Sequence, residues 1–440
     1  MSALSLSEAA ELALASARQR GADQAEVSLQ DGAGVSLTVR QGELETIERH
    51  NDCQLSISVY KDHKTGAASS ADLTTNGIVD TVEAALSIAS FTGVDEALGL
   101  ADAERMATDL PDLDLYHPWG VSTTDLIDIA TRCESAAMAQ DKRIDNSEGA
   151  SVSSYTGSSI YANSHGFYSA REGSHHSLSC SVIASDEQGM QRDYWYDSQR
   201  DPAQLASAES IGARAGQRTA ARLGAKKLSS QVAPVLFDPS MAKSLLSHLL
   251  GALKGGAIYK KASFLLDQVG QTIAPPFLTL SEFPQLVGGS HSAAHDAEGV
   301  ATPEQRAIVA EGVLQSYVLG SYTARKLGLE STANAGGVRN VRVTNTGQSQ
   351  TELCQQMQRG LLVTELIGSG LNMVTGDYSR GAAGFWVENG EIAYPVEEIT
   401  IAGNVRDMLQ QIIAIGSDED PRGNIHCGSI LLESMTIAGS

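Results

Sequence analysis

Histidine is the residue type whose spacing first suggests chemistry in this chain, because imidazole binds metal ions and transfers protons near neutral pH. The chain has 440 residues and 10 histidines, of which His291 and His295 stand four positions apart. On a helix that spacing would place both rings on one face, where they could bind a metal ion. However, Ser292 stands where a zinc-peptidase motif has its glutamate base, and the preceding Gly288-Gly289-Ser290 favours a loop. We therefore expect an exposed loop here, with a metal site as the alternative.

The other histidines are weaker candidates. His175 and His176 are adjacent in a predicted strand, so their side chains point to opposite faces and one should face solvent. His248 lies within an apolar helical stretch, SLLSHLLGAL, which is typical of a core or interface histidine with a satisfied hydrogen bond. His426 precedes Cys427, but neighbours in sequence need not meet in space, so a catalytic thiol here is the weaker interpretation.

The remaining motifs give no self-evident active site. The sequence contains neither the G-x-S-x-G elbow of serine hydrolases nor a phosphate-binding P-loop. Its 5 cysteines lie far apart without a C-x-x-C pair, which is typical of free thiols in a reducing compartment. The first residues lack the pattern of a signal peptide, and no apolar run reaches the roughly 18 residues of a membrane span. We therefore expect a cytoplasmic protein.

The charge of the chain excludes some classes of partner. Lys and Arg number 31 against 53 Asp and Glu, giving a formal net charge of −22. A surface this acidic repels phosphate backbones and anionic lipids, so we expect neither nucleic-acid binding nor membrane adhesion. The simplest interpretation of this charge is solubility; the sharper alternative is that it excludes acidic partners or attracts basic peptide segments. The hydrophobic fraction of 42% is enough for a packed core, and the length suggests two or three domains.

The elements predicted from hydrophobic periodicity give an α+β fold in three parts. Residues 1–95 form an N-terminal α/β domain with a helix over 5–20, short antiparallel strands, a hairpin tip at 60–66 and a helix over 74–91. After a linker, residues 120–225 form a central region that packs against it. This region has a capped helix from Ser122 to Ala139, three or four strands over 143–197, and a helix from Asp201 to Gly224. Residues 226–440 contain a strand at 234–237, a helix after Asp238-Pro239, and then a β-rich domain of barrel or sandwich character.

Several segments carry a family resemblance. They are His295-Asp-Ala-Glu-Gly-Val300, Gly360-Leu-Leu-Val-Thr-Glu-Leu-Ile-Gly368, Asn372-Met-Val-Thr-Gly-Asp-Tyr-Ser-Arg380, Gly384-Phe-Trp-Val-Glu-Asn-Gly390 and, more loosely, Val39-Arg-Gln-Gly-Glu-Leu-Glu45. Together these segments resemble the PmbA/TldD peptidase family, whose members are also described as modulators of DNA gyrase. The resemblance spans nearly the whole chain and is strongest over residues 295–440.

The resemblance also identifies what this chain lacks. One kind of family member carries H-E-x-x-x-H on a helix and binds a catalytic metal. At the comparable positions this chain has Ser247, His248 and Ala252, so both metal-binding histidines and the glutamate base are replaced. Zinc catalysis needs about three protein ligands and an open position for water. The chain therefore resembles the PmbA (TldE) type, and we expect no catalytic residue, metal or cofactor in it.

The resemblance implies a role in a pair. A TldD-like catalytic subunit would hold a zinc-type metal inside a chamber, and this chain would be its non-catalytic, metal-free partner in a heterodimer. The pair would degrade or process small or unfolded peptides, including antitoxins and microcin precursors. This chain would help to form the chamber wall and bind extended peptide by main-chain pairing.

Two alternatives stay open at this point. One is a self-sufficient metallopeptidase or other hydrolase with an unrecognised site, at the His291/His295 loop or at the His426-Cys427 pair. The other is a homodimeric peptide-binding protein without peptidase activity. A homodimer of the isolated chain would not by itself decide between these roles, because the paired folds of the family allow a self-pair.

Overall fold

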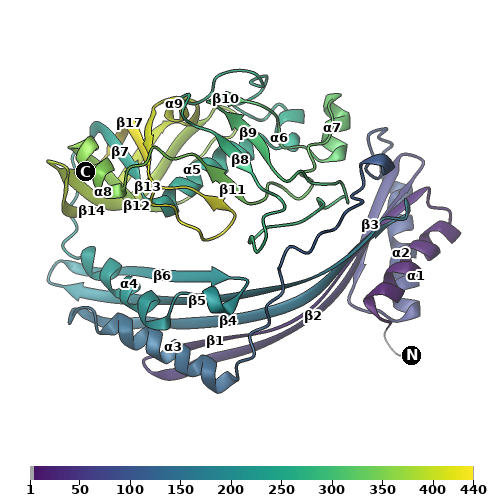
Figure 1. Ribbon diagram of the computed structural model, residues 1–440, viewed down its shortest axis with the longest axis horizontal. Helices are drawn as coiled ribbons and strands as arrows, with labels where there is room; N and C mark the ends of the chain where they lie inside the picture. Colours follow the sequence, from purple (N-terminus) through teal and green to yellow (C-terminus); the bar gives the residue numbers. More distant parts are fainter. Residues whose placement is uncertain (1–3, 440) are drawn as a thin grey trace.

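Six long antiparallel strands form one curved sheet in the first half of the chain (Figure 1). The computed structural model describes residues 4–439. The strand order is β3-β2-β1-β4-β5-β6, and every neighbouring pair is antiparallel. The strands are β1 (Gln24–Arg40), β2 (Glu43–Lys61), β3 (Lys64–Ser70), β4 (Ile144–Asn163), β5 (Tyr168–Asp186) and β6 (Gly189–Gln199).

Four helices cover the convex face of this sheet, and their ends follow the capping signals of the sequence. In α1 (Leu6–Gln19) the Ser5 and Glu8 side chains form a capping box, and Gly21, at φ +84°, follows its last turn. In α3 (Thr123–Met138) Ser122 and Asp125 form the same reciprocal pair. The other two helices are α2 (Thr75–Phe91) and α4 (Ala208–Ala221).

The strands bury alternate residues beneath these helices. In β1, Val27 and Leu29 pack under α1 and α2, whereas Leu37 and Val39 pack under α3 and α4. Leu29 and Leu37 are fully buried, so each contributes roughly 1.5–3 kcal/mol of hydrophobic stabilisation. The intervening residues are mostly polar or small and face the C-terminal half of the chain, which lies over the concave side of the sheet (Figure 1).

The C-terminal half is built around a closed barrel. Five strands form the ring, because β14 pairs with both β13 and β17: β7 (Gln231–Phe237), β12 (Gly360–Ile367), β13 (Asp377–Glu388), β14 (Glu391–Asn404) and β17 (Ile430–Ala438). β15 (Ile412–Ile415) extends β17. The core contains Trp386 and Phe237 and continues under α5 (Pro239–Ala252). This barrel confirms the predicted α+β class and the barrel character of the C-terminal part.

A smaller sheet and four short helices complete this half. The sheet order is β10-β9-β8-β11-β16, with strands β8 (Leu280–Glu282), β9 (Arg306–Ala310), β10 (Val313–Leu314), β11 (Val341–Val343) and β16 (Ile425–His426). The helices are α6 (Gly255–Tyr259), α7 (Ser321–Leu327), α8 (Gln350–Met357) and α9 (Val405–Gln410). Two 3₁₀ turns, Ala103–Arg105 and Pro202–Gln204, lie in the connections of the first half.

Two local predictions were wrong. The short alternating segments of the N-terminal region are parts of continuous strands, and β1 alone has 17 residues. The helix expected from Asp201 begins only at Ala208, because the Asp201 side chain caps a separate 3₁₀ turn and Ser207 provides the actual helix cap. The hairpin tip was right: its turn is Asp62-His63, with φ +51° and +57°.

The first two predicted regions share one sheet, because β1 pairs with β2 on one side and with β4 on the other. The outermost predicted domain limits, residues 1 and 440, lie outside the described residues. All five cysteines are free thiols, as expected. Among the described helices, none is long and apolar enough to cross a membrane.

Candidate functional site

The positions that resemble a metallopeptidase motif lie in the second half of α5. Asp238 caps this helix by accepting a hydrogen bond from the Ser240 backbone amide (3.0 Å). Ser247 is exposed, His248 is half-buried, and Ala252 has 0% exposure. Of these three side chains, only that of His248 carries a strong metal ligand.

The surroundings of His248 do not fit a metal ion. Burial lowers the pKa of its imidazole, and the nearby Arg380 guanidinium lowers it further. Arg380 donates a hydrogen bond to Ser244 on the same helix (2.8 Å), so a fixed positive charge lies beside the histidine. In residues 4–439 no group of three or more His, Cys, Asp or Glu side chains could hold a metal. The residues present at this position therefore do not fit the family's metal.

The expected hydrogen bond of His248 was wrong. Its Nε2 atom is buried without a partner, and the ring meets the ring of Tyr378 edge-on at 5.9 Å between centroids. The lowered pKa of His248 favours the neutral ring, which is less costly to bury than an imidazolium.

The His291/His295 segment is a loop, as the glycines predicted, but its two rings have different environments. His295 is buried, and both of its ring nitrogens have partners: Ser169 Oγ at 2.8 Å and the Asp296 carbonyl at 2.7 Å. His291 is exposed and lies 3.1 Å from Ser290 Oγ through Nδ1. The prediction of an exposed loop was therefore wrong at His295, which joins the loop to strand β5. With both nitrogens bonded, His295 is not available as a ligand.

The His426-Cys427 pair does not form a nucleophile. Cys427 is fully buried, and burial raises the pKa of its thiol to about 12, so the thiolate is not populated near neutral pH. His426 points elsewhere, with its Nε2 atom 3.1 Å from the Gly423 carbonyl. The prediction for adjacent His175 and His176 was correct: His175 is exposed and His176 is fully buried.

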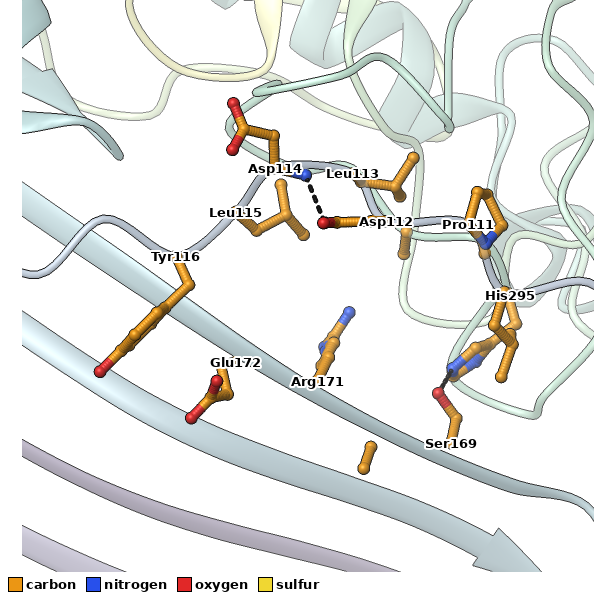
Figure 2. A pocket seen from close by; sticks show the side chains of 14 residues that line it. Pro111, Asp112, Leu113, Asp114, Leu115, Tyr116, Ser169, Arg171, Glu172 and His295 are labelled. Carbon is orange, nitrogen blue, oxygen red and sulfur yellow. Dashed lines mark hydrogen bonds between the residues drawn. The ribbon is translucent and has the colours of Figure 1, made fainter.

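Two adjoining cavities lie between the concave face of the sheet and the C-terminal half. One, of about 410 Å³, has a floor of β4 and β5 and a roof of the loop around residues 290–292 together with Arg339. The other, of about 470 Å³, lies between β5 and linker residues 110–116. Figure 2 shows the second cavity, with Arg171 pointing from the sheet toward the linker and His295 bonded to Ser169 at one end. Arg171 lines both cavities.

The first of these cavities, which we call the cationic cleft, is lined by Arg171, Arg200, Arg339, His175 and His291. Burial lowers the pKa of all three guanidinium groups, and Arg171 further lowers those of Arg200 and Arg339. Arg171 and His175 nevertheless keep exposed surface, because they face the open space of the cleft. Side chains that lie deep in a cavity and still keep accessible surface are what a ligand-binding site requires.

The contacts of these arginines are with neutral groups. Arg171 donates to Ser159 Oγ (3.1 Å). Arg200 donates to the carbonyls of Gly289 (3.1 Å), Ser174 (3.3 Å) and Ser290 (2.6 Å). Arg339 Nε is buried without a partner. Among the described residues, none of the three forms an ion pair.

Sequence reasoning did not find this cleft, because its charged residues come from three distant segments. One signal was present in β1 and β4, where glycine and serine alternate with buried positions. A Cβ atom at Gly32 would lie 1.8 Å from the Tyr155 hydroxyl oxygen, so this glycine is needed for the Tyr155 side chain to lie across the sheet. Small residues on one face of a strand indicate close approach of another group.

Comparisons with known proteins agree along nearly the whole chain. Models of the PmbA/TldA metallopeptidase family match residues 25–89 (domain 1), 116–223 (central domain) and 230–439 (C-terminal domain). The chain is 48% identical over 417 residues to Metalloprotease PmbA of Escherichia coli O157:H7, covering 95% of this chain and 92% of that protein. It is 45% identical over 437 residues to the Metalloprotease PmbA homolog of Haemophilus influenzae, covering 99% and 96%.

Solved structures share the same architecture. A Bacteroides thetaiotaomicron protein, described under a suggested role as a modulator of DNA gyrase, matches with a TM-score of 0.93 and 29% identity over 99% of both chains. TldE from Thermococcus kodakarensis matches with a TM-score of 0.81 over 98% of this chain and 100% of that one. At 23% identity the second likeness concerns the fold alone.

Proposed function

Because the chain belongs to the PmbA/TldA metallopeptidase family, we propose that it is the non-catalytic, metal-free subunit of a heterodimeric peptidase. A TldD-like partner would hold the zinc-type metal. The pair would act in the cytoplasm on small or unfolded peptides, including antitoxins and microcin precursors. The observation that carries this proposal is α5, where Ser247, His248 and Ala252 offer one imidazole beside the Arg380 cation.

The chemistry of α5 supports a role without catalysis. A catalytic zinc site needs about three ligands and an open position where bound water loses a proton. The Ser247 hydroxyl is a weak ligand and the methyl group of Ala252 is none. Arg380 adds a repulsive charge at the place where a divalent cation would have to bind. Because relatives of this chain are called metalloproteases, we infer that the metal would come from another subunit of an assembly.

A free strand edge supports the existence of a partner. β2 pairs with β1 along its length, but on its other side β3 covers only Leu55 to Lys61. Residues 43–54 of β2 have no strand neighbour on that side among the described residues, and nearly all of them are exposed. Leu44 and Ile47 are 43% and 41% exposed. Such an edge is a template for pairing with another chain.

The concave face supports the binding of extended peptide. Its inward residues are mainly serine and glycine, and pairs such as Thr38–Ser151 and Ser153–Ser177 hydrogen-bond to each other at 2.8 Å. The adjoining cavities between this face and the C-terminal half have room for a few peptide residues, not for a folded domain. An unfolded chain would enter such a space more readily than a folded one.

The proposal is tested by titrating the purified chain into a TldD-like catalytic subunit from the same organism. Cleavage of an unfolded peptide should be absent with this chain alone and should rise to saturation near equal amounts of the two subunits. Metal analysis of the isolated chain should find less than stoichiometric zinc. Cleavage by the chain alone with bound transition metal, or no stimulation at any ratio, would refute it.

A matched pair of variants tests whether the β2 edge forms the contact. Ile47→Asp places a charge on the free edge, whereas Ile413→Asp places one on β15 at the same 41% exposure. The first should weaken the pairing at least tenfold and the second should not. A stable homodimer that does not bind the catalytic subunit would instead favour a peptide-binding protein without peptidase activity.

A further inference from the structure

The cationic cleft has a local charge opposite in sign to the net charge of the chain. The whole chain carries −22, yet three arginines line this cavity against one carboxylate, that of Glu172. His175 and His291 add two further rings that can donate hydrogen bonds. Exclusion of acidic partners was one alternative interpretation of the overall charge. At this point in the interior, the local charge favours an anion.

Arg171 and Arg339 in the cleft differ from Arg306 and Arg422 elsewhere in the molecule. Arg306 pairs with Glu282 at 2.6 Å, and Arg422 pairs with Asp420 at 2.8 Å. Arg171 and Arg339, in contrast, have no carboxylate within ion-pair distance among the described residues. A partly desolvated guanidinium without an ion-pair partner is less stable than a paired one, so an anionic ligand would compensate the charge of these two arginines.

We propose that the cationic cleft is a binding site for a peptide carboxylate, with Arg171 and Arg339 as its principal donors. The peptide as carrier of that carboxylate rests on the proposed function, whereas the preference for a carboxylate rests on the cleft itself. A planar guanidinium binds a carboxylate through two parallel hydrogen bonds, which gives both affinity and orientation. Arg200 would contribute charge, because its own donors are already bonded to three carbonyls.

The adjoining cavity indicates in which direction a bound peptide would run. Asp112, Asp114 and Glu172 line it, and Figure 2 shows the linker residues on the side opposite β5. The aspartates therefore line only the second cavity, Arg200 and Arg339 line only the first, and Arg171 and Glu172 line both. A short peptide would place its carboxylate in the cationic cleft and its amino side along the linker.

The shape of the floor fits a flat, extended ligand. Gly157 and Gly173 lie opposite each other on β4 and β5 and line the cleft without side chains. A Cβ atom at Gly173 would lie 3.3 Å from Arg200 Nη1. The glycines thus let Arg200 and a ligand approach the strand backbone closely.

The test uses the purified full-length chain and isothermal titration calorimetry with tetra-alanine. A free C-terminal carboxylate is compared with the C-terminal amide, which distinguishes the terminal carboxylate. Two amidated tetrapeptides, one with an internal glutamate and one with glutamine, distinguish a side-chain carboxylate. We expect at least one acid form to bind tenfold or more tightly than its neutral counterpart, as loss of a charged hydrogen bond implies.

Arginine variants then locate the site. Arg171→Gln and Arg339→Gln should each weaken binding of the preferred acid about tenfold and leave the neutral peptide unchanged. The matched control is Arg18→Gln, since Arg18 is exposed on α1 and forms no ion pair among the described residues. Circular dichroism verifies that each variant is folded. The proposal is overturned by equal affinity for acid and neutral peptides, or by unchanged binding in both cleft variants.

Two further outcomes separate this inference from the proposed function. Inorganic phosphate that binds in the cleft while no tetrapeptide does would overturn the peptide site. If the chain stimulates the catalytic subunit but does not discriminate acid from amide, the inference alone fails. If it discriminates acid from amide but never stimulates the partner, the subunit role fails and the carboxylate site stands.

Discussion

Two regions of this molecule gather arginine and histidine, and they use them in opposite ways. Around α5, Lys243 and Arg422 both pair with Asp420, and Arg380 bonds to Ser244. In the cationic cleft the three arginines form no ion pair among the described residues, and Arg171 faces open space. Charges of the first kind hold the fold together, whereas charges of the second kind are available to a ligand. On the proposals above, the position of the family's metal motif would be structural in this chain, and the binding chemistry would lie over the sheet.

The largest effect expected from this contrast is the loss of Asp420. Its carboxylate is buried and accepts two hydrogen bonds from the Arg422 side chain (2.8 and 2.9 Å) and one from Lys243 (2.8 Å). Arg422 also donates to the Tyr196 carbonyl and lies 3.9 Å from the Trp195 ring centre, so the cluster joins the two halves. Asp420→Asn should lower the free energy of unfolding by about 3–5 kcal/mol, measured by urea denaturation.

An exposed ion pair is the control for Asp420. Asp128 contacts Arg132 at 2.8 Å on the surface of α3, where the side chains are 66% and 47% exposed. Asp128→Asn should change the free energy of unfolding by about 0.5 kcal/mol or less. Equal losses in the two variants would break the distinction between structural and exposed charges.

The next effect concerns rebuilding of the metal motif. Ala252 has 0% exposure and packs in the barrel core, so Ala252→His must displace its neighbours. We expect the free energy of unfolding to fall by about 3 kcal/mol through overpacking. Ser247→His is the matched control, because the exposed Ser247 has room for the ring. The triple change S247H/H248E/A252H should gain no stoichiometric zinc by elemental analysis. Tight zinc binding would show that the barrel still accommodates the site.

The stability that Asp420 contributes should depend on pH. Burial opposes ionisation of Asp420, but the hydrogen bonds and charges of Arg422 and Lys243 outweigh it and lower its pKa to about 2. Because the pKa of the folded state lies below the unfolded value of about 3.9, the ionised group adds about 2 kcal/mol of stability above that value. This stability is lost as the pH falls from about 4 to 2. The difference in unfolding free energy between the native chain and Asp420→Asn should shrink over that range, and a constant difference would contradict it.

The sequence predicted the ends of helices and the hairpin turn better than it predicted the length of the strands. The caps at Ser5 and Ser122 and the turn at Asp62-His63 follow local chemistry, so they were readable without tertiary information. The length of β1 was not readable, because Gly32 and Gly34 resemble a break. Only the packing of Tyr155 across them explains why glycine belongs inside a strand.

The candidate site also has one part that local sequence reveals and one part that depends on tertiary packing. The resemblance located the α5 positions, since they are adjacent in sequence and form one motif. The cationic cleft joins Arg171, Arg200 and Arg339, which are brought together only when the C-terminal half lies over the sheet. The overall charge gave no indication of this cleft, because a net charge of −22 averages over the surface and does not describe an interior cavity.

The smallest stability effect, and the sharpest test of the contrast, is expected for Arg171→Gln. Arg171 forms no ion pair among the described residues, so its removal leaves no carboxylate unpaired and relieves the cost of a partly desolvated charge. The free energy of unfolding should change by no more than about 0.5 kcal/mol. Arg306→Gln, which leaves Glu282 buried at 1% exposure without its cation, is the matched variant and should lose about 3 kcal/mol. A comparable loss for Arg171→Gln in urea denaturation would mean that the cleft arginines hold the two halves together, and the contrast between the regions would disappear.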